Sequence, residues 1–218
     1  QRAIEIKEPL KITIERFDKD FFSVNTDSLA TAIPHLEQKY GSFLLLFSER
    51  MVGIGSPYQR QYGFMMNRFI NDYTVNRAYV ACQKVFPNMD YAQSELSAAF
   101  SRYHALFPQK IVPRVISFIS GFNQSIAITD SVLAIGIDKY LGRDNEVYQQ
   151  LDFPRYLVYN FTLNRIPVDA VRGWVMGDFS YTVLVNILIS RMVYEGKIMY
   201  LIAQLLSNVP DSTLFGYS

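Results

Sequence analysis

The supply of histidine and cysteine limits the nucleophilic chemistry that this chain can do. A Ser or Cys nucleophile needs a histidine base within reach, and only His35 and His104 are present. The sequence has no G-x-S-x-G elbow, and Cys82 lies in the apolar segment YVACQKVF, which is typical of a small core residue. These features argue against a catalytic triad. A single cysteine also excludes an intramolecular disulfide.

The sequence also limits which phosphate-binding and carboxylate-based sites the chain could form. Gly53 and Gly55 in MVGIGSP lack the third glycine and the Lys-Ser or Lys-Thr pair of a phosphate-binding loop, so this segment predicts a turn. Paired carboxylates can act as general acid and base. A carboxylate-based hydrolase around Asp138, Asp169 and Glu195 therefore stays open as an alternative, although the spacings match no glycosidase or calcium loop.

Two charged segments stand out in the C-terminal half. RIPVDAVRGW places Asp169 and Arg172 at i and i+3, close enough on a helix for an ion pair. Glu195 and Lys197 interrupt the apolar segment ILISRMVYEGKIMYLIAQLL, where a buried charge needs a partner. Gly196 between them weakens a helix and indicates close packing at that point. We expect these side chains to share a polar cavity.

The elements that must position these residues follow from the hydrophobic pattern. Half of the 218 residues are hydrophobic and the net charge is +1, which predicts one domain with a sizeable core and no affinity for nucleic acid. Strands are predicted at residues 10–17, 111–120, 125–129 and 131–137. Helices are predicted from a cap at Thr26 or Asp27 to residue 36, and at residues 58–86 with a break near 71–74, 90–107, 154–161, 167–179 and 182–206, with a loop around Pro210 and Gly216.

This order of elements predicts an α+β fold, mostly helical, with a small and mainly antiparallel sheet. Tight-turn residues at Gly121, Asn123 and Asp130 favour a meander, packed beneath the helix that begins near Pro167. The longest apolar segment, residues 183–206, is interrupted by charges and predicts a buried helix rather than a membrane span.

Five segments resemble a known family. They are IERFDKDFF (residues 14–22), GIDKYLGRD (136–144), IPVDAVRGW (166–174), YEGKIMYLI (194–202) and the terminal LFGYS. In this order they resemble the gliding-motility lipoprotein family GldB of Bacteroidetes cell envelopes. The resemblance implies a lipid on a cysteine upstream of Gln1 and a location exposed to the periplasm. It also implies a family that continues beyond Ser218, so we expect the chain to be truncated.

The GldB family is itself similar to predicted zinc peptidases in which HExxH on one helix is followed by an EG motif on the next. Val168 to Arg172 stand in place of HExxH, and Glu195 in place of the acid of the EG motif. Zinc in such a site needs two imidazoles, and neither valine nor arginine can ligate it. The resemblance therefore implies a zincin-like fold without metal or cofactor, with a vestigial cleft formed by Val168, Asp169, Arg172, Glu195 and Lys197.

The expected function is that of a non-enzymatic cell-envelope lipoprotein associated with gliding motility or a related surface machine. Its expected partners are envelope or gliding-machinery proteins, and only the lipid anchor is expected to touch the membrane. Two alternatives stay open: a peptide- or glycan-binding module that uses the vacated cleft, and the carboxylate-based hydrolase. We expect Arg172 to fill the metal position and to pair with Glu195, Asp169 or both.

Overall fold

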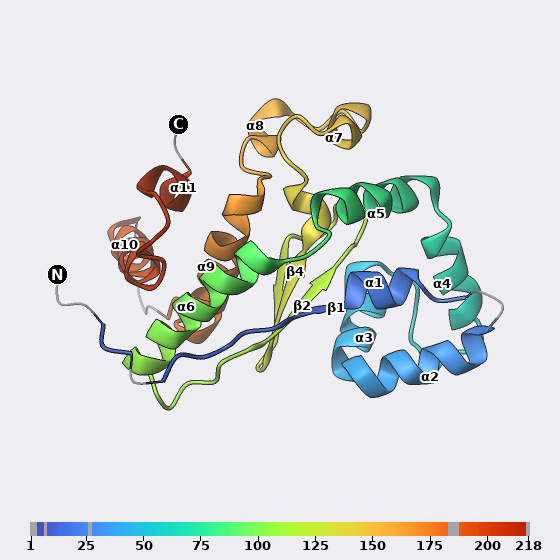
Figure 1. Ribbon diagram of the computed structural model, residues 1–218, viewed down its shortest axis with the longest axis horizontal. Helices are drawn as coiled ribbons and strands as arrows, with labels where there is room; N and C mark the ends of the chain where they lie inside the picture. The colour runs from blue at the N-terminus through green and yellow to red at the C-terminus, as the bar shows by residue number, and fades with distance from the viewer. Residues whose placement is uncertain (1–3, 7, 26–27, 183–187, 217–218) are drawn as a thin grey trace.

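A small sheet lies between two groups of helices in the computed structural model, which describes residues 4–6, 8–25, 28–182 and 188–216 (Figure 1). Helices α1 to α4 lie on one side of the sheet, and α6, α9, α10 and α11 lie on the other. The sheet contains β1 (Ile14–Arg16), β2 (Arg114–Phe118), β3 (Ile126–Ile128) and β4 (Val132–Gly136), in the order β1-β2-β4-β3. The predicted α+β class is confirmed.

The predicted mainly antiparallel meander is wrong. β1 and β2 pair in parallel, β2 and β4 also pair in parallel, and only β3 and β4 are antiparallel. The reason is the position of β4, which inserts between β2 and β3. Residues 119–131, which include β3, form a connection long enough to return the chain in the parallel direction.

The N-terminal helices enclose an aromatic cluster. They are α1 (Phe17–Phe22), α2 (Leu29–Tyr40), α3 (Ser42–Leu46) and the π-helical turn η2 (Phe47–Met51). The rings of Phe17, Phe21 and Phe47 lie 4.9–5.1 Å apart, mostly edge to face. The strand predicted to reach Phe17 is therefore shorter than expected, because this ring starts α1 and packs away from the sheet. α2 continues four residues beyond the predicted end at residue 36, and Gly41 ends it with φ 53°. The predicted helix start at Thr26 or Asp27 lies outside the described residues.

The middle helices follow the predicted pattern. They are α4 (Tyr62–Ile70), α5 (Tyr73–Val85) and α6 (Asp90–Leu106), and the predicted break near residues 71–74 is confirmed. Asp72 causes the break, because its carboxylate accepts hydrogen bonds from the amides of Thr74 and Val75 at the start of α5. Cys82 is buried in α5, as expected.

An extended N-terminal segment runs along α6 before it enters the sheet. Three hydrogen bonds join them: the amides of Leu10, Ile12 and Ile14 donate to Ser101 Oγ, Ser97 Oγ and Gln93 Oε1 at 2.8, 3.0 and 3.1 Å. Two residues of extended chain advance about 6.6 Å and four helical residues about 6.0 Å, so the two spacings match. We call this contact the N-terminal strap.

The C-terminal half is helical after the sheet. It contains the 3-10 turn η3 (Ile137–Tyr140), α7 (Glu146–Gln150), α8 (Arg155–Val158), the 3-10 turn η4 (Leu163–Arg165), α9 (Ile166–Asp178), α10 (Leu188–Leu205) and α11 (Asp211–Phe215). α9 packs on β3 and β4, which confirms that the helix near Pro167 covers the sheet. The segment predicted as a terminal loop contains α11, which Gly216 ends in the left-handed conformation. Residues 183–187 of the last predicted helix lie outside the described residues.

The prediction that the last long helix is buried is wrong. α10 buries Ile198, Ile202 and Leu205, whereas Ile189 and Tyr200 on its other side are largely exposed. Composition does not reveal this arrangement, because both faces of the helix are apolar. Within the described residues, no helix is long and apolar enough to cross a membrane.

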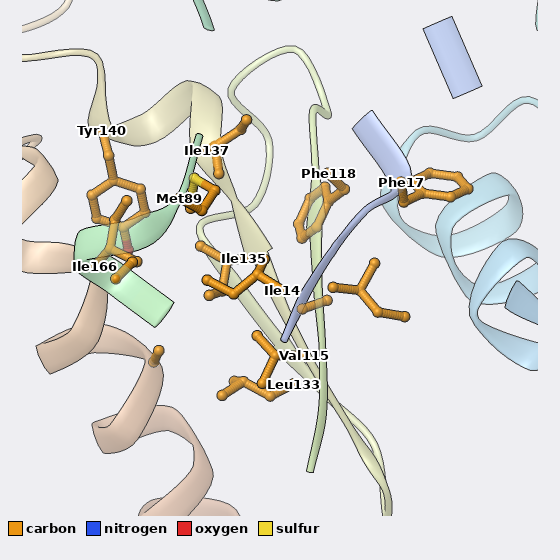
Figure 2. Close-up of a cluster of buried hydrophobic side chains, with 14 of the residues drawn as sticks. Ile14, Phe17, Met89, Val115, Phe118, Leu133, Ile135, Ile137, Tyr140 and Ile166 are labelled. Atoms are coloured by element: carbon orange, nitrogen blue, oxygen red, sulfur yellow. The ribbon is translucent and has the colours of Figure 1, made fainter. Parts of the chain in front are cut away.

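The core runs through the sheet from one helical group to the other. Figure 2 shows Ile14, Val115 and Ile135 of the strands, with Phe118 toward the N-terminal helices and Ile166 toward α9. These side chains belong to one cluster of buried hydrophobic residues. Both α9 and the N-terminal helices are therefore positioned by the same sheet.

Candidate functional site

The ion pair between Arg172 and Glu195 joins the two helices that carry the candidate residues. Arg172 Nη2 on α9 donates to Glu195 Oε2 on α10 at 2.9 Å. The predicted pairing of these two side chains is confirmed. Both are partly exposed, at 38% and 31%, so the pair lies at the edge of the α9–α10 contact rather than in a sealed cavity.

Asp169 has different partners from those expected. Its Oδ1 accepts a hydrogen bond from Arg165 Nε at 2.9 Å, and its Oδ2 accepts one from the Tyr140 hydroxyl at 3.0 Å. Burial raises the pKa of Asp169, while Arg165, Tyr140 and the charge of Arg172 act in the opposite direction. Arg172 is thus an electrostatic neighbour of Asp169 but is bonded to Glu195.

Arg165 is a site residue that the sequence interpretation missed. Its guanidinium also donates to the carbonyls of Thr213 and Leu214, so it connects the start of α9 to α11. The i, i+4 spacing of Arg165 and Asp169 was a usable signal, since such pairs face each other on a helix. Tyr140 comes from η3, and no sequence pattern near it indicated that its hydroxyl would contact Asp169.

The structure separates the remaining candidates. Val168 is buried among apolar side chains and offers no lone pair to a metal. Lys197 is exposed, and two residues correspond to about 200° around a helix, so it points away from Glu195. In the part of the chain that the structure describes, no ion pair involves Lys197.

Asp138 is fully buried at the end of the sheet. Its Oδ2 accepts hydrogen bonds from the amides of Ser120 and Phe122 at 3.0 and 2.7 Å, and its Oδ1 has no hydrogen-bond partner. Burial raises the pKa of Asp138 to about 6, although these two amides and Lys139 lower it. The carboxylate therefore fixes the loop after β2, in which Phe122 adopts a positive φ of 68°.

These placements bear on the hydrolase alternative. Asp138, Asp169 and Glu195 are each held by different groups, and no described residue bonds to two of them. Among the described residues, no group of three or more His, Cys, Asp or Glu side chains could hold a metal ion. The absence of zinc stays a prediction for elemental analysis.

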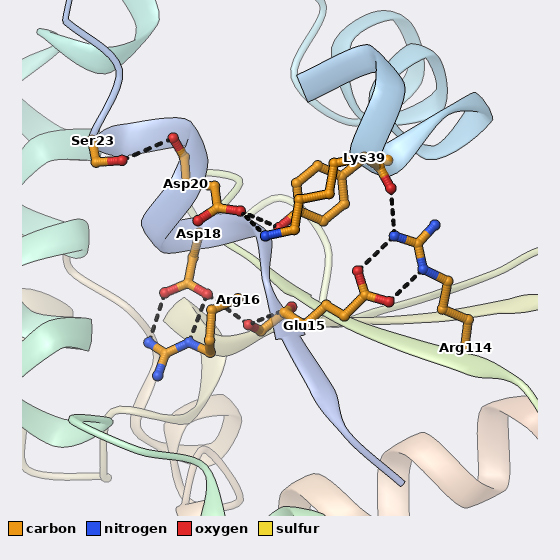
Figure 3. A network of polar contacts seen from close by, with 9 residues as sticks. Glu15, Arg16, Asp18, Asp20, Ser23, Lys39 and Arg114 are labelled. Atoms are coloured by element: carbon orange, nitrogen blue, oxygen red, sulfur yellow. Dashed lines mark hydrogen bonds and ion pairs between the residues drawn. The ribbon is translucent and has the colours of Figure 1, made fainter. Parts of the chain in front are cut away.

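The first family segment, IERFDKDFF, forms a polar network at the carboxyl end of β1 (Figure 3). Asp18 is buried and accepts two hydrogen bonds from Arg16, at 2.9 and 2.7 Å. It also accepts hydrogen bonds from Ser117 Oγ at 2.6 Å and from Gln83 Nε2 at 3.1 Å. Since every bond of Asp18 ties α1 to β1, β2 or α5, this segment has a structural role.

Several hollows in the described part of the chain lie outside the candidate residues. One, of about 230 Å³, lies between the end of β3 and α9, where it is lined by Ile128, Trp174 and Asp178 among others. A larger groove of about 860 Å³ lies along α7 and α8. Its lining includes Tyr148, Phe153, Tyr159, Arg143 and Arg155, and the Arg143 guanidinium stacks 4.5 Å from the centre of the Tyr159 ring.

Comparison with known proteins gives one match. The family described as gliding motility protein GldB matches residues 1–218. Searches of curated proteins and of solved structures found no match. The relation to zinc peptidases therefore has no support from these comparisons, whereas the match to the family spans all the residues of the sequence. The chain belongs to the gliding motility protein GldB family.

Proposed function

We propose that this domain is a non-enzymatic, metal-free part of the gliding-motility apparatus. Membership of the GldB family associates the chain with gliding motility and with lipoproteins of the cell envelope. The finer proposal is that α9 and α10 keep the layout of a zinc-peptidase site, with an ion pair in place of the metal. Its partners would be envelope proteins of the same machinery.

The observation that carries this proposal is the contact between Arg172 and Glu195 at 2.9 Å. A guanidinium cannot bind a cation, and it satisfies the carboxylate that would otherwise be available as a ligand. Asp169 is similarly occupied by Arg165 and Tyr140. With Val168 buried and apolar, the segment VDAVR offers zinc no free donor.

Restoring the metal ligands tests the correspondence with HExxH. The triple variant Val168→His, Asp169→Glu, Arg172→His should bind about one zinc per chain, with Glu195 as a third ligand. Adding Glu195→Ala should weaken zinc binding by about tenfold or more. The wild-type protein should hold no zinc by elemental analysis. A folded triple variant that binds no zinc would show that VDAVR does not stand in a zincin site.

A second experiment separates a non-enzymatic role from the hydrolase alternative. The gene would be deleted in its own host and complemented with Asp169→Asn or Glu195→Gln, which keep the shape of each side chain but remove the general base. Surface movement should be restored by both variants at equal protein level. Loss of movement with either variant, at unchanged abundance, would support catalysis instead.

Ligand binding is a second candidate function, favoured by the groove along α7 and α8. The partly exposed rings of Phe153 and Tyr159 and the exposed guanidinium groups of the groove suit stacking and hydrogen bonding to a peptide or glycan. This groove lies away from the cleft that the sequence interpretation had assigned to binding. Peptide and glycan arrays should show a ligand whose retention is lost on Tyr159→Ala and kept on Tyr58→Ala, a substitution at an exposed tyrosine outside the groove.

A further inference from the structure

β3 lies at one edge of the sheet, where it pairs with β4 only. Ala127 pairs with Ala134 of β4, and the carbonyl of Ser125 accepts a hydrogen bond from the last residue of β4. Successive residues of a strand turn their backbone groups to opposite sides. The amides and carbonyls of Ile126 and Ile128 therefore point away from β4, and an edge of this kind can pair with another extended chain.

The opposite edge of the sheet, formed by β1, is bonded to a helix. There the amide of Ile14 donates to Gln93 Oε1 of α6 at 3.1 Å, as part of the N-terminal strap. At β3 the exposed side chain of Gln124 donates to the carbonyl of Ile126 at 3.0 Å. In the described part of the chain, no hydrogen bond involves the amides of Ile126 or Ile128. The described residues thus cover this edge with one side chain, which another backbone can displace.

α9 covers a face of β3 rather than its edge. Ile126 and Ile128 turn their side chains toward Gly173 and Gly177 of α9. The backbone hydrogen bonds of a strand point across the sheet, at right angles to these side chains. The positions of β3 are accordingly half-buried or exposed, whereas all five positions of β4 are buried. α9 therefore leaves the outward amides and carbonyls of β3 accessible.

The hollow of about 230 Å³ continues this edge at the end of β3. It is lined by Ile128, Thr129 and Asp130, and by Trp174, Gly177 and Asp178 of α9. Sites for drug-sized ligands enclose roughly 300–1,000 Å³, so this hollow suits a single side chain. Residues opposite each other on neighbouring strands turn their side chains to the same face of the sheet. A strand added beside Ile128 would therefore direct one side chain into the hollow.

The walls of the hollow favour a basic side chain. Trp174 provides an apolar wall, and Asp130 and Asp178 provide two carboxylates. Asp178 forms an ion pair with Lys110 at 3.3 Å. The exposed side chain of Asp130, in contrast, has no hydrogen bond or ion pair within the described residues. A lysine or arginine can lay its apolar stem along Trp174 and place its charge beside Asp130.

We propose that β3 and the hollow bind an extended segment of another polypeptide, which adds a strand to the sheet and places a lysine or arginine beside Asp130. Backbone hydrogen bonds to Ile126 and Ile128 would hold the segment, and the hollow would select the basic residue. A second copy of the chain cannot supply this residue by pairing β3 with β3, because residues 119–131 contain no lysine or arginine. The inference does not depend on the proposed function.

Hydrogen exchange of single amides, followed by NMR, tests the edge first. In the free protein the amides of Ile126 and Ile128 should exchange at least about tenfold faster than that of Ala127, which is bonded to β4. A bound segment should slow Ile126 and Ile128 by about tenfold or more and leave Ala127 little changed. Protection of all three amides in the free protein would overturn the proposal, because the edge would already be covered.

The probe is a heptapeptide selected on the protein from a random library displayed on phage. Enriched sequences should carry a lysine or arginine next to β-branched or aromatic residues, which favour a strand. Asp130→Lys should weaken binding of the selected peptide by about tenfold or more, because it brings like charges together. Asp90→Lys makes the same change of charge at an exposed position at the start of α6, and should leave the affinity unchanged.

Methylation of single backbone nitrogens in the selected peptide tests whether it binds as a strand. Every second methyl group should weaken binding by about tenfold or more, because the amides that face β3 lose their hydrogen bonds. The methyl groups between them point away from β3 and should have little effect. Replacement of the basic residue by norleucine should weaken binding by about threefold or more, since it removes the charge beside Asp130.

Several results would overturn the proposal. The first is a set of enriched peptides without a basic residue, or with binding that Asp130→Lys leaves unchanged. The second is a methylation series without alternation. Binding lost on Tyr159→Ala instead would assign the peptides to the groove along α7 and α8. Dimerisation of the protein with protection of Ile126 and Ile128 would identify a second copy of the chain as the occupant.

Discussion

At the scale of single residues, the buried carboxyl group of Asp138 is held at the end of the sheet in an environment that disfavours its charged form. It is completely enclosed, and only one of its oxygens is bonded. Burial without a cation disfavours the charged form, which is why the pKa of Asp138 rises to about 6. The side chain is useful because it accepts the two loop amides, a task that needs an oxygen but no charge.

The first prediction concerns whether the loop needs the oxygen of Asp138 or its charge. The pKa of Asp138 is about 6 in the folded state and about 4 when unfolded. The folded state therefore binds the extra proton in this window, and the contribution of Asp138 to stability falls as pH rises from about 4 to about 6. Asp138→Asn keeps the acceptor oxygen, so at about pH 7.5 it should exceed the wild type in stability by up to about 3 kcal/mol.

Urea unfolding at two pH values measures this effect. The advantage of Asp138→Asn should vanish at about pH 3, where the wild-type carboxyl is protonated in both states. Asp138→Ala serves as the control, because it leaves two amides without an acceptor and should lose about 2 kcal/mol or more at both pH values. An asparagine variant less stable than the wild type at about pH 7.5 would show that the loop requires the charge.

The second prediction concerns the energy of the Arg172–Glu195 pair. Because both side chains are more than 30% exposed, their coupling should be under about 1 kcal/mol, rather than the roughly 3 to 5 kcal/mol of a buried pair. A double-mutant cycle with Arg172→Ala and Glu195→Ala measures it. Arg165→Ala is the comparison. It should lower the free energy of unfolding more than Arg172→Ala does, since Arg165 is better buried and also bonds α11. Equal destabilisation by Arg165→Ala and Arg172→Ala would contradict the conclusion that the Arg172–Glu195 pair lies at the exposed edge of the helix contact.

The sequence predicted part of this residue-level arrangement. From the resemblance to a metal site, in which carboxylates need a positive charge, it predicted that Arg172 binds Glu195, Asp169 or both, and the bond to Glu195 is present. It did not predict the partners of Asp169, since Tyr140 reaches it only through the folding of η3 against α9. It placed Lys197 in the cleft because it took α10 to be buried all round. An exposed helix face leaves that lysine in solvent.

At the scale of elements, the contact between α9 and β3 depends on two glycines one turn apart. A Cβ on Gly173 would lie 2.7 Å from Cγ2 of Ile126, and a Cβ on Gly177 would lie 2.6 Å from Cδ1 of Ile128. At Gly173 the helix can therefore lie close to the strand only because the position lacks a side chain, whereas at Gly177 the free end of Ile128 could move aside. This closeness positions Asp169 and Arg172 on the same helix relative to the sheet.

The third prediction distinguishes the two glycines. Gly173→Ala should destabilise by about 1 to 3 kcal/mol, because Cγ2 of Ile126 is attached to the Cβ next to the backbone and cannot rotate away freely. Gly177→Ala should be nearly neutral, since Cδ1 of half-exposed Ile128 is the free end of its side chain. Thermal or urea unfolding measures both. Recovery of Gly173→Ala by Ile126→Ala would confirm the clash, and additive losses would contradict it.

The elements differ in how far their sequences determine them. The break between α4 and α5 was predictable because Asp72 caps the second helix locally. The direction of the strands was not predictable. The turn residues after Phe118 fit either β3 or β4 as the neighbour of β2. What decides is the burial of all five positions of β4, which suits a central strand, here between parallel β2 and antiparallel β3.

At the scale of the whole molecule, the N-terminal strap makes the two helical groups interdependent. β1 pairs with β2, which follows about a hundred residues later, and the segment before it is bonded along α6. α6 in turn bonds the end of α10, where the Arg102 guanidinium donates to the Leu205 carbonyl at 2.7 Å. The C-terminal group is therefore completed by a segment from the start of the chain, and the N-terminal helices pack on the same sheet through β2.

This interdependence gives the last prediction: the chain should unfold in one cooperative transition. Trp174 is the only tryptophan and is buried on α9, so its fluorescence follows the C-terminal group, whereas circular dichroism follows the helices of both groups. The two melting curves should coincide. Ser97→Ala deprives the Ile12 amide of its acceptor, at a cost of about 1 to 2 kcal/mol. Both curves should therefore shift down together, by about 3 to 6 °C for a chain of this length.

Ser94→Ala is the matched control for the strap, because Ser94 lies on the same helix but is exposed, and its removal should leave both curves in place. Curves that separate in the wild type would mean that the two helical groups unfold independently. A Ser97→Ala shift in circular dichroism alone would lead to the same conclusion, because the strap would then stabilise the N-terminal group without reaching α9. Coincident shifts would instead mean that the stability of the region around α9, which carries Arg172, is coupled to a hydrogen bond near the start of the chain.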